Sequence, residues 1–272
     1  MRVFNKRKLY TAFLAVLFLF TSQVVVAYTV SCRAVIFSDA TKVKRLYGKR
    51  VHERVVPAST VKVMTALLAL EHLSLDEYVT VSQNATYPQP SKIYVKAGER
   101  YKVRDLLYAV LLGSANDAAV VLAEAVAGTH WKFAQMMTQR AKQLGAKHTR
   151  FANAHGLPTK KKDPQYTTAY DMYLIFRQAM RHEFFREAIK LKNRTITSSH
   201  GRRIALRSHN KILFKGWKKN IYGKTGYTRS AGPCFVGTTQ KGDSTLIIAV
   251  FNCKDRWNDI KYIISHYGGI SL

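Results

Sequence analysis

The first segment that could perform covalent chemistry is Ser59-Thr60-Val61-Lys62, at the start of an apolar stretch with helical spacing. A serine hydroxyl is a weak nucleophile until a neighbouring group removes its proton. A lysine amine can accept that proton if burial or a nearby cation lowers its pKa. Because Lys62 follows Ser59 by about one helical turn, the two side chains should share a face. The segment therefore predicts Ser59 as nucleophile and Lys62 as general base.

A second segment, Ser114-Ala115-Asn116, lies between two expected helices. In a cleft shared with Ser59, the hydroxyl of Ser114 would relay protons and the amide of Asn116 would bind a substrate amide. The alternative is structural, since Asn116 and Asp117 are also well placed to cap the following helix.

A third segment, Lys224-Thr225-Gly226, opens an expected strand. Lys224 and Thr225, with Gly226, would hold a substrate carboxylate, and the charge of Lys224 would lower the pKa of Lys62. Backbone N–H groups of Ser59 and of the strand after Lys224 would form an oxyanion hole. The structural alternative makes Lys62 a surface residue and Lys224 a charge that protects a strand edge.

Context separates these segments from chance matches. Ser208-His209-Asn210-Lys211 is a second Ser-x-x-Lys, and Ser82 also begins a Ser-x-Asn. Ser208 precedes no apolar helix, however, so its lysine has no reason to face it. No Gly-x-Ser-x-Gly turn is present to support a Ser-His-Asp site. The set built on Ser59 is therefore preferred.

The expected elements place strands at both ends of the chain and helices between them. Strands are expected at Arg33–Asp39, Val43–Tyr47, Tyr78–Ser82, Lys92–Lys96, Thr195–Ser199, Arg203–Leu206, Lys224–Thr228, Phe235–Thr239 and Leu246–Asn252. Helices are expected at Ser59–Leu73, Leu106–Leu112, Ala118–Ala127, Trp131–Leu144, Thr168–Met180 and Trp257–His266. This order predicts an α/β (α+β) fold, an antiparallel sheet flanked by helices with a mostly helical insertion. Residues 28–272 would form one domain, with its sheet region at about 28–80 and 195–272 and its helical region at about 81–194.

The first 27 residues read as an export signal. Arg2, Lys6, Arg7 and Lys8 precede an apolar run and a small residue at a cleavage point, Ala27. An uncleaved anchor stays open, because no charge occurs from Leu9 to Ser31. Either reading places the protein in the periplasm or on the outer face of the cytoplasmic membrane.

The charge balance points to anionic surroundings. The chain has 44 Lys plus Arg and 16 Asp plus Glu, a formal charge of +28. A field of this size attracts polyanions. For an exported protein these would be anionic membrane lipids or cell-wall polymers. No zinc-finger, RRM or helix-turn-helix signature supports a nucleic-acid partner.

Cysteine and histidine usage gives no sign of a cofactor or metal. Three cysteines are too few for a disulfide scaffold. Cys234 and Cys253 lie on two neighbouring expected strands, so a disulfide between them is possible and is left open. His148 and His155 lack the spacing of a zinc site, and no metal is expected.

The motifs together resemble the serine-type D-alanyl-D-alanine carboxypeptidases, the low-molecular-mass penicillin-binding proteins. The similar text spans most of the chain from about residue 30, in the segments 57–66, 111–119, 151–157, 168–172 and 224–232. The resemblance implies that Ser59 attacks the terminal D-Ala–D-Ala bond of peptidoglycan stem peptides, that water hydrolyses the acyl-enzyme, and that β-lactam antibiotics acylate the same serine. Many relatives continue into a β-rich C-terminal domain, which is not expected here.

One departure from the family pattern concerns Tyr222, which stands where relatives usually have glycine, while Gly223 adjoins Lys224.

Rival functions are a DD-endopeptidase or transpeptidase, a β-lactamase, and a non-catalytic basic wall-binding protein. The absence of a Glu-x-x-x-Asn between Ser114 and Lys224 disfavours a β-lactamase of class A. A non-catalytic protein would not need the three segments together.

Overall fold

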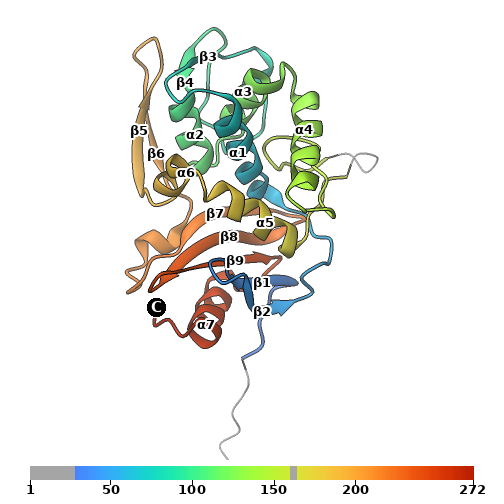
Figure 1. Ribbon diagram of the computed structural model, residues 1–272. Helices are drawn as coiled ribbons and strands as arrows, with labels where there is room; N and C mark the ends of the chain where they lie inside the picture. The colour runs from blue at the N-terminus through green and yellow to red at the C-terminus, as the bar shows by residue number, and fades with distance from the viewer. Residues whose placement is uncertain (1–27, 160–163) are drawn as a thin grey trace, which may run out of the picture.

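A computed structural model describes residues 28–159 and 164–272 of the protein. The expected export signal, residues 1–27, lies outside the described residues. Figure 1 shows two parts, a twisted antiparallel sheet and a helical region that stands against its β7 edge.

The strands and helices have the following bounds. The strands are β1 (Ala34–Asp39), β2 (Lys44–Lys49), β3 (Tyr78–Thr80), β4 (Arg100–Lys102), β5 (Asn193–Thr197), β6 (Arg203–Arg207), β7 (Tyr222–Thr228), β8 (Gly232–Lys241) and β9 (Ser244–Phe251). The α-helices are α1 (Lys62–His72), α2 (Val103–Leu111), α3 (Asn116–Ala127), α4 (His130–Gln143), α5 (Ala169–Ala179), α6 (Glu183–Ala188) and α7 (Arg256–Gly268). Short 3-10 helices are η1 (Ala58–Val61), η2 (Asn84–Thr86) and η3 (Lys211–Phe214).

The main sheet has the strand order β2-β1-β9-β8-β7, with every pair antiparallel. Its central strands are apolar on both faces because helices cover both. On β1, Ala34 and Ile36 join the core under the helical region, whereas Val35 and Phe37 join the core under α7. This alternation follows from the two-residue period of a strand. The sheet therefore supplies a platform, and β7 is the edge strand that contacts η1.

The helical region packs its apolar faces around α1 and α3. Leu67 of α1 and Leu122 of α3 are fully buried in the same core, and α5 connects this core to β1 and β9. Two small antiparallel sheets, β3–β4 and β5–β6, flank the helices (Figure 1). The arrangement holds the N-termini of α1 and α3 close to the β7 edge.

The fold class expected from the sequence, an antiparallel sheet with helices and a mostly helical insertion, is confirmed. One predicted element was wrong, and the short elements β4 and α6 were not predicted. Residues 92–96 form no strand, because the N–H groups of Ile93 and Val95 donate to the buried carboxylate of Asp117 rather than to another strand. The short helix α6 was missed, since six residues give too little periodicity to detect.

A disulfide joins Cys32 to Cys253, so the suggested pairing of Cys234 with Cys253 was wrong. The physical reason is the strand order. β1 lies beside β9 with Ala34 opposite Phe251, and two further residues along each strand bring Cys32 opposite Cys253. Cys234 is a free, buried cysteine, and burial raises the pKa of its thiol to about 11.

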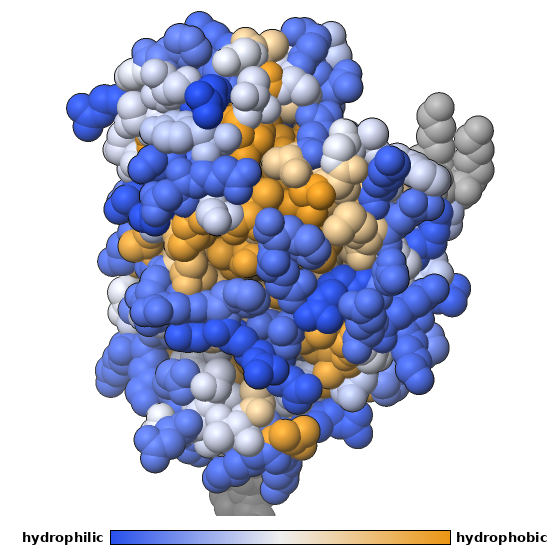
Figure 2. All heavy atoms as spheres, turned by 45° about the horizontal axis from the view of Figure 1, so that its top comes forward, coloured by the Kyte–Doolittle hydropathy of each residue, from blue (hydrophilic) through white to orange (hydrophobic). Residues whose placement is uncertain are grey.

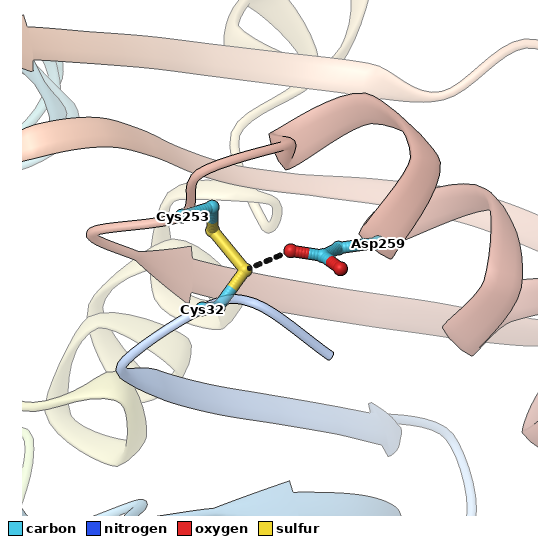
Figure 3. Close-up of side chains that lie close together, drawn as sticks. All are labelled: Cys32, Cys253 and Asp259. Atoms are coloured by element: carbon cyan, nitrogen blue, oxygen red, sulfur yellow. Dashed lines mark hydrogen bonds between the residues drawn. A yellow bond between two sulfur atoms is a disulfide. The ribbon is translucent and has the colours of Figure 1, made fainter. Parts of the chain in front are cut away.

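The residues around the disulfide fasten the start of the described chain to α7 (Figure 3). Oδ2 of the buried Asp259 lies 3.1 Å from Sγ of Cys32 and accepts a 2.5 Å hydrogen bond from the hydroxyl of Ser31. The hydroxyl of Tyr28 donates to the same carboxylate at 3.0 Å.

We expect the variant Cys32→Ser with Cys253→Ser to lose about 2–5 kcal/mol of unfolding free energy, because the bond closes a loop with a sequence separation of 221. Urea unfolding of this variant, with Cys234→Ala as a single-cysteine control, checks the value. Thiol titration of the denatured, unreduced wild type should find one free thiol per molecule, that of Cys234. Three thiols, or an unchanged unfolding midpoint in the double variant, would contradict the assignment.

Within residues 28–159 and 164–272, no helix has both the length and the apolar character that a membrane crossing requires. The face seen in Figure 2 is largely hydrophilic around a central apolar area, in keeping with the formal charge of +28.

Candidate active site

Ser59 lies at a turn whose shape is fixed by its neighbours. The N–H and the hydroxyl of Thr60 both donate to the carbonyl of Pro57, which closes η1 directly before α1. A Cβ at Gly156 would lie 2.0 Å from the carbonyl oxygen of Ala58, so only glycine permits this loop to press against the turn. The result is a partly exposed Ser59 on a buried, close-packed support.

The amine of Lys62 is completely buried and has three partners. Its Nζ lies 2.6 Å from Oδ1 of Asn116, 2.7 Å from the carbonyl oxygen of His155 and 3.1 Å from Oγ of Ser59. The first two partners can only accept hydrogen bonds. A neutral amine would therefore use its two N–H groups on Asn116 and His155, and its lone pair would face the hydroxyl of Ser59. This is the geometry of a general base.

Electrostatics favour that neutral amine. Burial first, and then the charge of Lys224, lower the pKa of Lys62 well below its ordinary value of 10.5, against a smaller opposing effect of Asp117. Burial first, and then the charges of Lys62 and His130, lower the pKa of the half-buried His155 side chain. The site thus keeps Lys62 able to accept a proton.

Ser114 and Lys224 form the second half of the site. Nζ of Lys224 donates to Oγ of Ser114 at 3.0 Å and to the carbonyl of Thr225 at 3.0 Å. Ser114 has a φ of +56°, which turns its side chain into the cleft from the end of α2. Burial and the nearby charge of Arg256 lower the pKa of Lys224 to about 7.

The strand β7 approaches Ser59 closely because it carries glycine at the point of contact. A Cβ at Gly226 would lie 3.1 Å from the backbone nitrogen of Ser59. Gly223 is likewise required, since a Cβ there would lie 2.2 Å from the carbonyl oxygen of Val236. Tyr222, the departure from the family pattern, packs against the main core and does not line the cleft.

These groups open onto a cleft of about 1280 Å³. Ser59, Ser114 and residues of β7 form its floor, and Arg256 adds a guanidinium. Nη1 of Arg256 donates to the carbonyls of Gly226 and Cys234, at 3.3 and 2.7 Å. Burial lowers the pKa of Arg256 only to about 10, so it stays charged at neutral pH.

The structure brings together all the residues predicted from the three segments: Ser59, Lys62, Ser114, Asn116, Lys224, Thr225 and Gly226. The structural alternatives for Lys62, Asn116 and Lys224 were wrong. Ala115 is the N-cap of α3, and the amide of Asn116 bridges Lys62 and the carbonyl of Gln89 instead of capping.

Sequence reasoning missed three residues that complete the site. The carbonyl of His155 and the guanidinium of Arg256 left no local signal, because their roles depend on distant parts of the chain. Asp117 was interpreted as a cap, but its fully buried carboxylate accepts from the backbone of Ile93 and Val95 and so fixes one wall of the cleft.

The second Ser-x-x-Lys has no such geometry. The hydroxyl of Ser208 accepts from the N–H of Asn210, and no described hydrogen bond joins Ser208 to Lys211, the first residue of η3. Among the described residues, Cys32, Cys253 and Asp259 form the one group of three metal-type ligands. Both of its sulfurs are committed to the disulfide, so the group presents only one carboxylate.

Solved structures of other proteins share this fold, at moderate sequence identity. A D-alanyl-D-alanine carboxypeptidase from Mycobacterium tuberculosis has a TM-score of 0.82 at 29% identity and covers 89% of this chain and 92% of its own. A mutant of the Streptomyces K15 DD-transpeptidase has a TM-score of 0.81 at 26% identity and covers 89% and 100%. The protein therefore has the fold of the DD-peptidases and penicillin-binding proteins.

Sequence comparisons define the family. The D-alanyl-D-alanine carboxypeptidase family matches residues 21–255, and the chain belongs to it. The carboxypeptidase DacF of Bacillus subtilis is 31% identical over 214 residues, 76% of this chain and 54% of that protein. DacC of Escherichia coli is 32% identical over 272 residues, 92% of this chain and 66% of that protein. The chain thus spans about half to two thirds of the length of these relatives. The family resemblance seen in the sequence is confirmed.

Proposed function

We propose that the protein is a serine-type D-Ala–D-Ala carboxypeptidase that removes the terminal D-Ala from peptidoglycan stem peptides. The observation that carries the proposal is the buried amine of Lys62, whose two acceptor partners leave its lone pair for the hydroxyl of Ser59. Family membership supports the substrate class.

In the proposed reaction, Oγ of Ser59 bonds to the carbonyl carbon of the penultimate D-Ala while its proton passes to Lys62. The N–H groups of Ser59 and of β7 after Lys224 stabilise the oxyanion. Ser114 relays a proton to the nitrogen of the departing D-Ala as the amide bond breaks. Water then hydrolyses the ester to Ser59, releasing the shortened peptide. β-Lactam antibiotics would acylate the same oxygen.

The carboxylate of the substrate would bind at the cationic end of the site. Lys224 and Arg256 both lie beside the backbone of Thr225 and Gly226. A carboxylate held by partly desolvated cations is bound more firmly than one on an exposed surface. This favours a peptide with a free C-terminus over an internal bond, and so a carboxypeptidase over an endopeptidase.

The proposal places residues 28–272 in one catalytic domain that acts outside the cytoplasm, in the periplasm or on the outer face of the membrane. The disulfide between Cys32 and Cys253 supports this, because disulfides persist in oxidising compartments. Anionic lipids or wall polymers are proposed partners on the ground of the +28 charge.

Purified protein incubated with a soluble peptide ending in D-Ala–D-Ala should release one D-Ala per peptide and no internal fragment. The same sample should be labelled by a fluorescent penicillin, and the label should be lost far more slowly than from a β-lactamase. Release of D-Ala without penicillin labelling, or rapid turnover of the penicillin, would contradict the proposal.

The pH dependence of the reaction should follow the ionisation of the Lys224 amine. Because its pKa is lowered to about 7, the amine is charged below that pH and neutral above it. We therefore expect kcat/KM for a free-carboxylate peptide to fall as the pH rises through about 7. In Lys224→Arg the guanidinium stays charged, so the fall should move to higher pH. A substrate with an amidated C-terminus is the control and should not show the shift. Equal falling limbs in variant and wild type would rule out this role.

A further inference from the structure

The cleft extends well beyond the groups that act on the terminal dipeptide. Its volume of about 1280 Å³ exceeds the roughly 300–1,000 Å³ of common small-ligand pockets. Besides these groups, its lining includes Lys92 from the segment after η2, Arg207 at the end of β6, and Lys211 and Lys215 from η3 and the residue that follows it. No aspartate or glutamate is among its described lining residues.

These four cations, which we call the outer basic cluster, lack carboxylate partners within the described part of the chain. Other cations pair with acids, such as Arg140 with Glu71 and Arg202 with Glu99. The described ion pairs include no member of the outer basic cluster. Its charge is therefore not neutralised within the described protein.

Aromatic rings and a carbonyl orient two of these cations. The guanidinium of Arg207 lies 4.6 Å from the ring centroid of Phe214. Nζ of Lys92 lies 5.2 Å from the ring of Tyr94 and donates to the carbonyl of Thr86 at 3.0 Å. A cation over a ring keeps N–H groups free for an anion.

Hydrogen bonds join the backbone segments that carry these cations to the catalytic centre. The N–H of His209 donates to the carbonyl of Leu112, next to the Ser114 loop, and the amide of Asn210 donates to the carbonyl of Ile221, at the start of β7. The segment that follows Lys92 is held by the carboxylate of Asp117, which accepts from the N–H groups of Ile93 and Val95. The two cations that a ring or a carbonyl orients, Arg207 and Lys92, therefore need less ordering than a free side chain when an anion binds.

We propose that the outer basic cluster is a subsite for carboxylate groups that the peptide substrate carries upstream of its terminal D-Ala–D-Ala. The proposal rests on the proposed function, since a peptide bound for attack by Ser59 must continue along the cleft. A free anionic polymer bound at the outer basic cluster would instead compete with the peptide substrate for the cleft.

Two soluble peptides with the same D-Ala–D-Ala end test this proposal. One carries a free carboxylate on an upstream residue, and in the other that group is the neutral amide. We expect wild type to prefer the acidic peptide by about fivefold to tenfold in kcat/KM at low salt, the effect of one or two partly exposed ion pairs. The variant Arg207→Gln, Lys211→Gln, Lys215→Gln should lose this preference and keep its activity on the amide peptide.

A matched control removes three exposed lysines elsewhere, with Lys132→Gln, Lys142→Gln and Lys147→Gln. It should keep the preference, which separates a local subsite from the general field of the protein. Equal preference in the cleft variant and wild type would overturn the subsite while leaving the carboxypeptidase proposal intact. Loss of preference in the control would also overturn it. Failure of wild type on both peptides would instead contradict the proposed function.

Discussion

The variant Ser59→Ala should lose both the release of D-Ala and the labelling by penicillin. Removing the nucleophile of a serine hydrolase costs on the order of 10⁶-fold in kcat, which places the residual rate near the detection limit. Ser59 is partly exposed and its hydroxyl is one of three partners of Lys62. The free energy of unfolding should therefore change by only about 0.5 kcal/mol.

Thermal unfolding and the circular dichroism spectrum of Ser59→Ala control for loss of the fold. Ser208→Ala is a matched variant, because Ser208 also begins a Ser-x-x-Lys and lines the same cleft. It should retain D-Ala release and labelling. If Ser59→Ala stays folded and is still labelled, the assignment of the nucleophile is wrong.

The variant Lys62→Arg should lose about 10²–10⁴-fold in the acylation rate, the usual contribution of a general base. A guanidinium stays protonated and has no lone pair to accept the proton of Ser59. In wild type, acylation should rise with pH through an ionisation well below 10.5, because burial and Lys224 lower the pKa of Lys62.

A bulkier side chain in a fully buried position can disturb folding, so a second variant is needed. Lys62→Cys alkylated with bromoethylamine restores an amine of lower basicity at the same position. We expect it to regain acylation, with the rising limb of the pH profile moved to lower pH. An unmoved limb, or full acylation by folded Lys62→Arg, would rule out Lys62 as the base.

Much of the site was predictable because its motifs are local. Ser59 and Lys62 share a helical turn, and Lys224, Thr225 and Gly226 follow one another on a strand. Residue spacing along a helix or strand fixes which side chains share a face. That the segments meet in one cleft was inferred from the chemistry they share, and the structure brings them together.

The remaining features depend on contacts between distant segments. The disulfide partner of Cys253 follows from β1 lying beside β9, a strand order that no local pattern reveals. The carbonyl of His155 is invisible in the sequence because every residue has one. Asp117 is a residue type common at the start of a helix, so the sequence suggests a cap. Only the fold shows that its carboxylate accepts hydrogen bonds from the 93–95 segment.

The most direct test of the account is to identify the acylated residue. Protein quenched during turnover of a D-Ala–D-Ala peptide, and separately after penicillin treatment, would be digested and mapped by mass spectrometry. We predict that both the peptidyl group and the penicilloyl group are found on Ser59. An acyl group on Ser114 or Ser208, or release of D-Ala with no acylated serine in either sample, would contradict the account.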